Sequence, residues 1–107
     1  MKRILIATAV ALSLVAPTAQ ALTEVITYIP AVWIQRDGSR TFYGTVNGPC
    51  GSAIFNVSKS LANFNELRDD LVIAMVKSYK VDLVVEACEG TYNTVTFAKV
   101  CRDSTYC

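Results

Sequence analysis

The sequence predicts a small, mainly β domain that is cross-linked by disulfide bonds and contains a single helix. Three observations support this prediction. Short runs of β-branched and aromatic residues recur along the chain, separated by Gly, Pro and Asn turn signals. Only the stretch 63–79 combines apolar residues at helical spacing with a helix-start signal. Four cysteines, an even number, lie in the part of this short chain that follows residue 21.

The first 21 residues have the pattern of a secretory signal peptide. Two basic residues precede an apolar run (4–16), which ends at Pro17 and is followed by the small-x-small motif Ala-Gln-Ala at 19–21. This run is shorter than the roughly 20 residues that a membrane-spanning helix needs. We therefore expect Sec-type export in a bacterium, cleavage after residue 21 and no membrane insertion afterwards. Residues 22–107 would form one secreted or periplasmic domain.

Charge and residue types exclude several classes of function. Without Lys2 and Arg3, eight basic residues stand against nine acidic ones, a balance that disfavours nucleic acid and anionic membrane surfaces. The chain has no histidine, so it lacks Ser-His-Asp and Cys-His machinery, and it has neither a histidine nor a Cys-x-x-Cys pair to suggest a zinc site. We expect no enzyme, no metal and no cofactor. The acidic residues that could form a two-carboxylate site are interpreted as solvated charges: Asp69, Asp70, Asp82, Glu86 and Glu89.

The first half of the mature chain predicts three strands. Residues 23–35 are β-branched and aromatic, and Pro30 within them implies an edge position or a bulge. The turn containing Asp37-Gly38 leads into a return strand at 40–47, where Gly44 suggests the bend that a closing barrel needs. After a second turn, residues 52–58 alternate well enough for a third strand.

The helix is predicted over residues 63–79. Asn63 and Glu66 have the spacing of a capping box, in which each side chain satisfies a backbone N–H of the other residue. One apolar stripe should face the sheet and is formed by Phe64, Leu67, Leu71, Met75 and Ser78. A second stripe is either covered by a groove of the domain or forms a subunit contact, and it consists of Val72, Ile73 and Val76.

Two further strands follow the helix. Residues 80–88 alternate, with Val81, Leu83, Val85 and Ala87 on one side and charged residues on the other. Residues 91–101 pair with them across the Glu89-Gly90 turn. Three meandering strands, a helix and a closing hairpin give the element order of a five-stranded OB-like barrel, with the helix between strands three and four. A three-plus-two α+β sandwich is the alternative.

The cysteines are interpreted as two structural disulfides in an oxidising compartment. Four cysteines allow three pairings. Cys101 and Cys107 enclose five residues, a loop that can turn back to bridging distance. Cys50 and Cys88 both lie at expected strand ends. We favour the pairs Cys50–Cys88 and Cys101–Cys107, and the other two pairings stay open.

Exposed aromatic side chains are the remaining candidates for ligand binding, because they stack on sugar rings or anchor a protein partner. Burial in the core is the favoured interpretation for Trp33, while the tyrosines are as readily exposed as buried. The candidates are Tyr28, Trp33, Tyr43, Tyr92 and Tyr106.

Residues 63–107 resemble the B subunits of pentameric AB-type bacterial toxins. Asp70, Ile73-Ala74 and Lys80-Val81 are similar to the helix and strand start of the cholera-type group. The ending VCRDSTYC resembles the cysteine loop of the pertussis and subtilase cytotoxin group. The resemblance implies an OB-fold, a ring pentamer and a host glycan as ligand, and it identifies no sugar-binding residue. Cys50 departs from the cholera-type pattern, which places that cysteine near the N-terminus.

Two functional hypotheses follow. The first is a secreted, non-catalytic binding module, toxin B-subunit-like, that assembles as a homo-oligomer and binds a host glycan or protein. The second is a monomeric periplasmic accessory or inhibitor-like protein without glycan binding.

Overall fold

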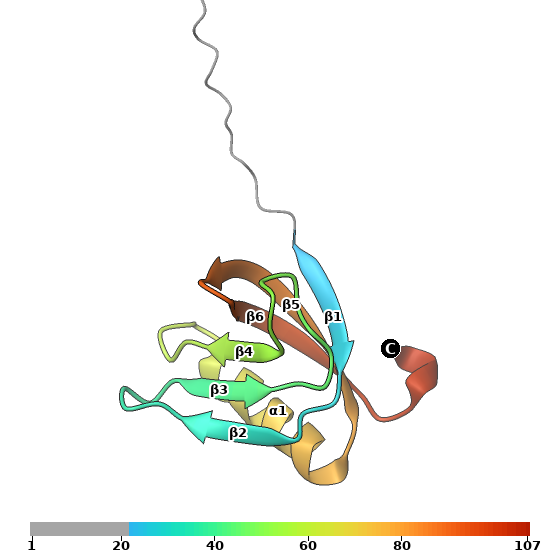
Figure 1. Cartoon of the computed structure of the whole chain (residues 1–107). Coiled ribbons are helices and arrows are strands. Elements are labelled where there is room, and N and C mark those ends of the chain that lie inside the picture. Colours follow the sequence, from blue (N-terminus) through green and yellow to red (C-terminus); the bar gives the residue numbers. More distant parts are fainter. Residues whose placement is uncertain (1–21) are drawn as a thin grey trace, which may run out of the picture.

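The computed structural model describes residues 22–107, and the predicted signal peptide lies outside these residues. The described chain forms one curved sheet with a helix packed against it (Figure 1). Its elements are β1 (Thr23–Thr27), β2 (Ala31–Ile34), β3 (Arg40–Tyr43), β4 (Ile54–Val57), α1 (Phe64–Lys77), β5 (Lys80–Glu89), β6 (Tyr92–Cys101) and the 3-10 helix η2 (Ser104–Tyr106).

The sheet is mixed, six-stranded and open, with the strand order β1-β5-β6-β4-β3-β2. The prediction of a five-stranded closed barrel is therefore wrong: the sheet has six strands, and its two edge strands, β1 and β2, do not pair with each other. The expected first strand divides because the chain leaves the ladder before Pro30, which has no N–H to donate. Its two halves pair at opposite edges, β1 with β5 and β2 with β3. All pairs are antiparallel except β4 with β6.

Gly44 marks a bend directly after β3, and only glycine fits there. A Cβ at this position would lie 2.8 Å from Thr27 Oγ1 and 2.8 Å from a ring carbon of Phe55. The neighbouring Thr45 N–H donates to Thr27 Oγ1 at 2.7 Å. The close approach therefore ties the end of β1 to the chain that follows β3.

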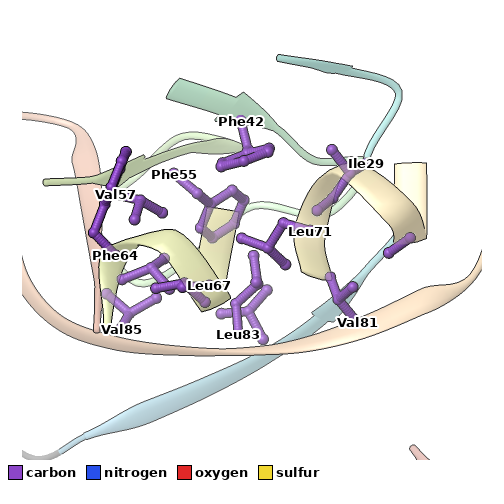
Figure 2. Packing of buried hydrophobic residues seen from close by; sticks show 13 residues of the cluster. Ile29, Phe42, Phe55, Val57, Phe64, Leu67, Leu71, Val81, Leu83 and Val85 are labelled. Atoms are coloured by element: carbon purple, nitrogen blue, oxygen red, sulfur yellow. The ribbon is translucent and has the colours of Figure 1, made fainter. Parts of the chain in front are cut away.

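Helix α1 covers the inner face of the sheet, where it contacts β4, β5 and β6. Figure 2 shows Phe55 and Leu71 pointing into the same apolar cluster, between the helix and the strands. Alternate residues of the strands complete this core, which gives the sheet one buried face. The most fully buried apolar side chains are Phe42, Phe55, Val57, Leu71, Ala74, Val81, Leu83 and Val95.

The helix ends differ from the prediction. Asn63 makes no capping hydrogen bond, so the expected capping box is wrong. Its Nδ2 instead donates to the Thr96 carbonyl at 3.1 Å, which ties the helix start to β6. On the predicted inner stripe, Phe64, Leu67 and Leu71 are buried, Met75 is half-buried and Ser78 is exposed, while Ala74, which the prediction left out, is buried. Ser78 ends the helix in the left-handed conformation, at φ 58°, and therefore cannot continue the buried stripe.

Both favoured disulfides are confirmed. Cys50 and Cys88 have Cα atoms 5.5 Å apart and join the loop before β4 to β5. Cys101 and Cys107 have Cα atoms 5.7 Å apart and close the C-terminal loop that contains η2.

Candidate ligand-binding face

Trp33 lies on the face of the sheet opposite α1, here called the outer face. Its side chain is 64% exposed, so the expected burial of Trp33 is wrong. The physical reason is register: Val32 pairs with the fully buried Phe42, and alternation turns the next residue of β2 outward. The Trp33 and Tyr43 ring centroids are 6.3 Å apart, with planes inclined at 57°. Two of the five predicted aromatics thus form one pair, in which Trp33 is exposed and Tyr43 is half-buried.

Polar side chains continue from Trp33 across the outer face. Trp33 pairs with Thr41, Thr41 with Asn56, and Asn56 with Thr94, so that four strands contribute to one row. Gln35 Nε2 donates to Thr41 Oγ1 at 2.7 Å, and Thr41 Oγ1 donates to Asn56 Oδ1 at 2.9 Å. This chain of hydrogen bonds fixes the orientation of the Asn56 amide. Its Nδ2 donor then points away from the Thr41 contact.

The row opens into a polar cleft of about 230 Å³ at the β2–β3 turn. Asp37 lies in this turn, where the Ser39 N–H donates to its Oδ1 at 2.9 Å. That backbone hydrogen bond is the main reason that the pKa of Asp37 lies below its ordinary value, so Asp37 is charged at neutral pH. The cleft is lined by Gln35, Asp37, Ser39, Asn56, Val57, Ser58, Glu89 and Thr94.

The chemistry of this surface is recognition of a polar ligand. The exposed Trp33 ring, packed beside the half-buried Tyr43, offers a face for stacking, and the amides, hydroxyls and carboxyl groups of the cleft offer donors and acceptors. Across residues 22–107 no group of three or more potential ligands could hold a metal ion. Gln35 and Asn56 were absent from the sequence candidates, because an isolated amide carries no signal until the strand register brings it beside Trp33.

The other predicted tyrosines do not join the Trp33–Tyr43 pair. Tyr28 is exposed beyond β1, with the Lys80 ammonium 5.8 Å from its ring centroid. Tyr92 begins β6 and is exposed two residues before Thr94, so it shares the face of Thr94 by alternation. Tyr106 is exposed in η2, within the C-terminal disulfide loop.

The second helix stripe borders a groove between α1 and β2. Val72 is half-buried, whereas Ile73 and Val76 are 49% and 73% exposed. The groove has a volume of about 530 Å³ and is lined by Val32, Ile34, Arg40, Arg68, Asp69, Val72 and Ile73. Two of the three predicted interface residues therefore line one apolar groove, and Val76 lies outside its lining.

Asp82 is a buried acid, whereas its position in the sequence predicts a solvated charge. Its side chain is on the outer face of β5, yet the residue is only 8% exposed, and Oδ1 has no hydrogen-bond partner. Burial, and after it the neighbouring Glu24 carboxyl, raise the pKa of Asp82 to about 6, against an opposing effect of Lys99. Ile26 and Lys99 flank Asp82 on the adjacent strands. The solvated-charge interpretation of Asp82 is wrong.

No helix within residues 22–107 is long and apolar enough to cross a membrane. Comparison of the chain with protein-family models, curated proteins and solved structures gives no match.

Proposed function

We propose that this protein is an exported, non-catalytic binding module whose outer face takes a neutral glycan. The observation that carries the proposal is the exposed Trp33, packed on the half-buried Tyr43, beside a row of hydrogen-bonded polar side chains that ends in a cleft. Sugars present an apolar C–H face and a rim of hydroxyl groups. They therefore need both an aromatic platform and fixed donors and acceptors within the same few ångströms.

The spacing of the face supports a saccharide of more than one ring. Gln35 directly follows β2 and is two positions after Trp33 along the extended chain. The rise of a strand therefore separates their Cα atoms by about 6.7 Å. One sugar ring stacked on Trp33 would therefore leave the next ring over the polar cleft. Acidic side chains of Asp37 and Glu89 in that cleft favour a neutral ligand over an anionic one.

The proposed scaffold is an OB-like arrangement in which β1 and β2 act as two halves of one strand. These halves are separated by only three residues, yet they occupy the two edges of the sheet. The covalent link between them and the Thr27–Thr45 contact would then close the curved sheet in place of a ladder. The parallel β4–β6 pair and the helix between β4 and β5 support the same arrangement.

Export is supported by the two disulfides, which persist in oxidising compartments and not in the cytosol. Expression of the full chain in a bacterial host, followed by N-terminal sequencing of the extracytoplasmic product, tests this part. We expect a product that begins at Leu22. A cytoplasmic product that still begins at residue 1 would contradict export.

A glycan array that carries neutral and sialylated oligosaccharides tests the ligand. We expect saturable binding to neutral glycans, and roughly tenfold or greater weakening by Trp33→Ala and by Asn56→Ala, which is about 1.4 kcal/mol or more. Val76→Ala is the matched control, because it truncates an equally exposed apolar side chain on the helix side of the sheet. Binding that prefers sialylated glycans, or that falls equally in the control, would overturn the proposal.

A further inference from the structure

One threonine hydroxyl joins two amide side chains on the outer face. Gln35 Nε2 donates to Thr41 Oγ1 at 2.7 Å, and Thr41 Oγ1 donates to Asn56 Oδ1 at 2.9 Å. All three residues are half-buried, so their neighbours restrict the rotation of these side chains. A hydroxyl group has a single proton, so it accepts from one amide and donates to the other. This hydrogen-bond chain, here called the Thr41 relay, therefore holds the two amides with opposite polarity.

The remaining polar atoms of the two amides are open to the polar cleft. They are Gln35 Oε1, an acceptor, and Asn56 Nδ2, a donor, and both residues line the cleft. Within residues 22–107 neither atom takes part in a hydrogen bond, and neither is buried. Reversing the direction of the Thr41 relay would exchange the two roles and would still leave one donor and one acceptor. The cleft therefore offers a ligand one group of each kind.

The donor and the acceptor come from opposite sides of β3. Gln35 directly follows β2, Asn56 is on β4, and Thr41 of β3 lies between them. Neighbouring strands are about 4.8 Å apart, so the two amides belong to chain segments about 9.6 Å apart. The oxygen of a sugar hydroxyl is a single atom and reaches one of the two groups. A trans amide reaches both, because its N–H and C=O point in opposite directions.

We propose that the Gln35–Asn56 amide pair binds the acetamido group of a neutral 2-acetamido sugar whose ring stacks on Trp33. The sugar N–H donates to Gln35 Oε1, and the acetyl carbonyl accepts from Asn56 Nδ2. Trp33 and Thr41 are directly opposite on neighbouring strands, so their Cβ atoms are about 5 Å apart. A ring on the indole therefore brings a substituent on its C2 atom to the Thr41 relay. This inference rests on the proposed function and names the sugar class that the face selects.

The same polarity disfavours two close analogues of this sugar. A hydroxyl group at C2 engages one amide and leaves the other covered without a partner, which costs free energy. A free amino group at C2 is an ammonium donor and offers nothing that accepts from Asn56 Nδ2. A site that hydrogen-bonds one group of its ligand rejects analogues that lack this group.

Calorimetric titration of the exported, disulfide-bonded chain tests the selection. The probes are disaccharides of the gluco and galacto series that differ only at C2, where they carry acetamido, hydroxyl or amino groups. We expect roughly tenfold or greater preference for the acetamido form. Equal affinity for the hydroxyl form, tighter binding of the amino form, or binding of other neutral glycans only would overturn this inference and leave the proposed function. Absence of binding to any neutral glycan would overturn both.

A nearly isosteric variant tests the relay itself. In Gln35→Glu the carboxylate accepts from the Thr41 hydroxyl, which then accepts from Asn56 Nδ2, so that only acceptors face the ligand. We expect this variant to bind the acetamido sugar roughly tenfold more weakly and to bind the hydroxyl sugar as before.

Removal of the relay hydroxyl gives a second readout. Thr41→Val should reduce the ratio between the two affinities, a ratio that general destabilisation would not change. Thr91→Val is the matched control, because Thr91 is an exposed threonine outside the lining of the cleft, and it should keep the full preference. An unchanged preference in both Gln35→Glu and Thr41→Val would overturn the inference.

Discussion

Asn93 and Cys50, 43 positions apart in the chain, are joined by a hydrogen bond in which the Cys50 N–H donates to Asn93 Oδ1 at 3.0 Å. Asn93 Nδ2 donates to the carbonyls of Ser52 and Ile54, at 2.9 and 2.8 Å. The Asn93 side chain is fully buried. One amide therefore satisfies three backbone groups of the loop that leads into β4.

We expect Asn93→Ala to lower the free energy of unfolding by about 2–4 kcal/mol, because it leaves these backbone groups without their partner in a buried site. Urea denaturation followed by circular dichroism measures the loss. Asn65→Ala is the control, since Asn65 is exposed on α1, and its change should stay within about 0.5 kcal/mol. An equal loss in both variants would contradict the role given to Asn93.

The two disulfides should contribute unequally. They enclose sequence separations of 38 and 6 residues. Loop-closure entropy then gives about 4 kcal/mol for Cys50–Cys88 and about 2 kcal/mol for Cys101–Cys107. Thermal unfolding of the C50S/C88S and C101S/C107S double variants compares them. A larger loss from the C-terminal pair would show that the small loop carries packing beyond its chain entropy.

Asp82 should make stability depend on pH. Its pKa is raised from 3.8 to about 6 in the folded state, so the folded chain binds more protons than the unfolded chain between these values. The contribution of Asp82 is therefore most favourable below about pH 4, and stability is lost as the pH rises through about 6.

The variant Asp82→Asn removes this titration. It should stabilise the protein at pH 7 by roughly 2–3 kcal/mol relative to its effect at pH 3.5. Asp70→Asn, at an exposed helix position, should show no such difference. Parallel pH profiles of the wild type and Asp82→Asn would contradict the burial of this carboxyl group.

A substitution at Ser78 should raise the free energy of unfolding by relieving backbone strain. It is the only described non-glycine residue with positive φ, and its N–H donates to the Met75 carbonyl at 3.3 Å as the helix ends. Glycine adopts this conformation without strain, so Ser78→Gly should stabilise the protein by about 0.5–1 kcal/mol. Ser60→Gly, in the loop before α1, is the control and should bring no gain. Chemical denaturation of both variants measures the change in the free energy of unfolding that each substitution causes.

Local chemistry made much of the scaffold predictable. The strand regions, the helix and both disulfide pairs follow from alternation, helical spacing and the placement of cysteines beside turns. Gly44 could be assigned to a bend, but its partner Thr27 could not, because that contact depends on how the two ends of the sheet meet. Pro30 signalled an interruption without revealing that β1 and β2 would occupy opposite edges.

The candidate site was less accessible to sequence reasoning. Alternation gives two faces to a strand but does not say which is buried, so the sequence favours burial of Trp33, whereas Phe42 occupies the core and Trp33 is exposed. Asp82 alternates with core residues, a pattern that predicts a solvated charge, yet the residue is buried. Its burial depends on Ile26 and Lys99 of neighbouring strands. In each case the deciding contact lies on a strand that is distant in the sequence.

Trp33 is the only tryptophan of the chain, so its fluorescence reports directly on the proposed ligand-binding face. The most direct measurement is an emission titration with the neutral oligosaccharide selected on the array, with isothermal calorimetry on the same samples. The account predicts a saturable change in emission whose midpoint equals the calorimetric dissociation constant, and roughly tenfold weaker calorimetric binding by Trp33→Ala. Calorimetric binding without any change in Trp33 emission, and with full affinity in Trp33→Ala, would contradict it.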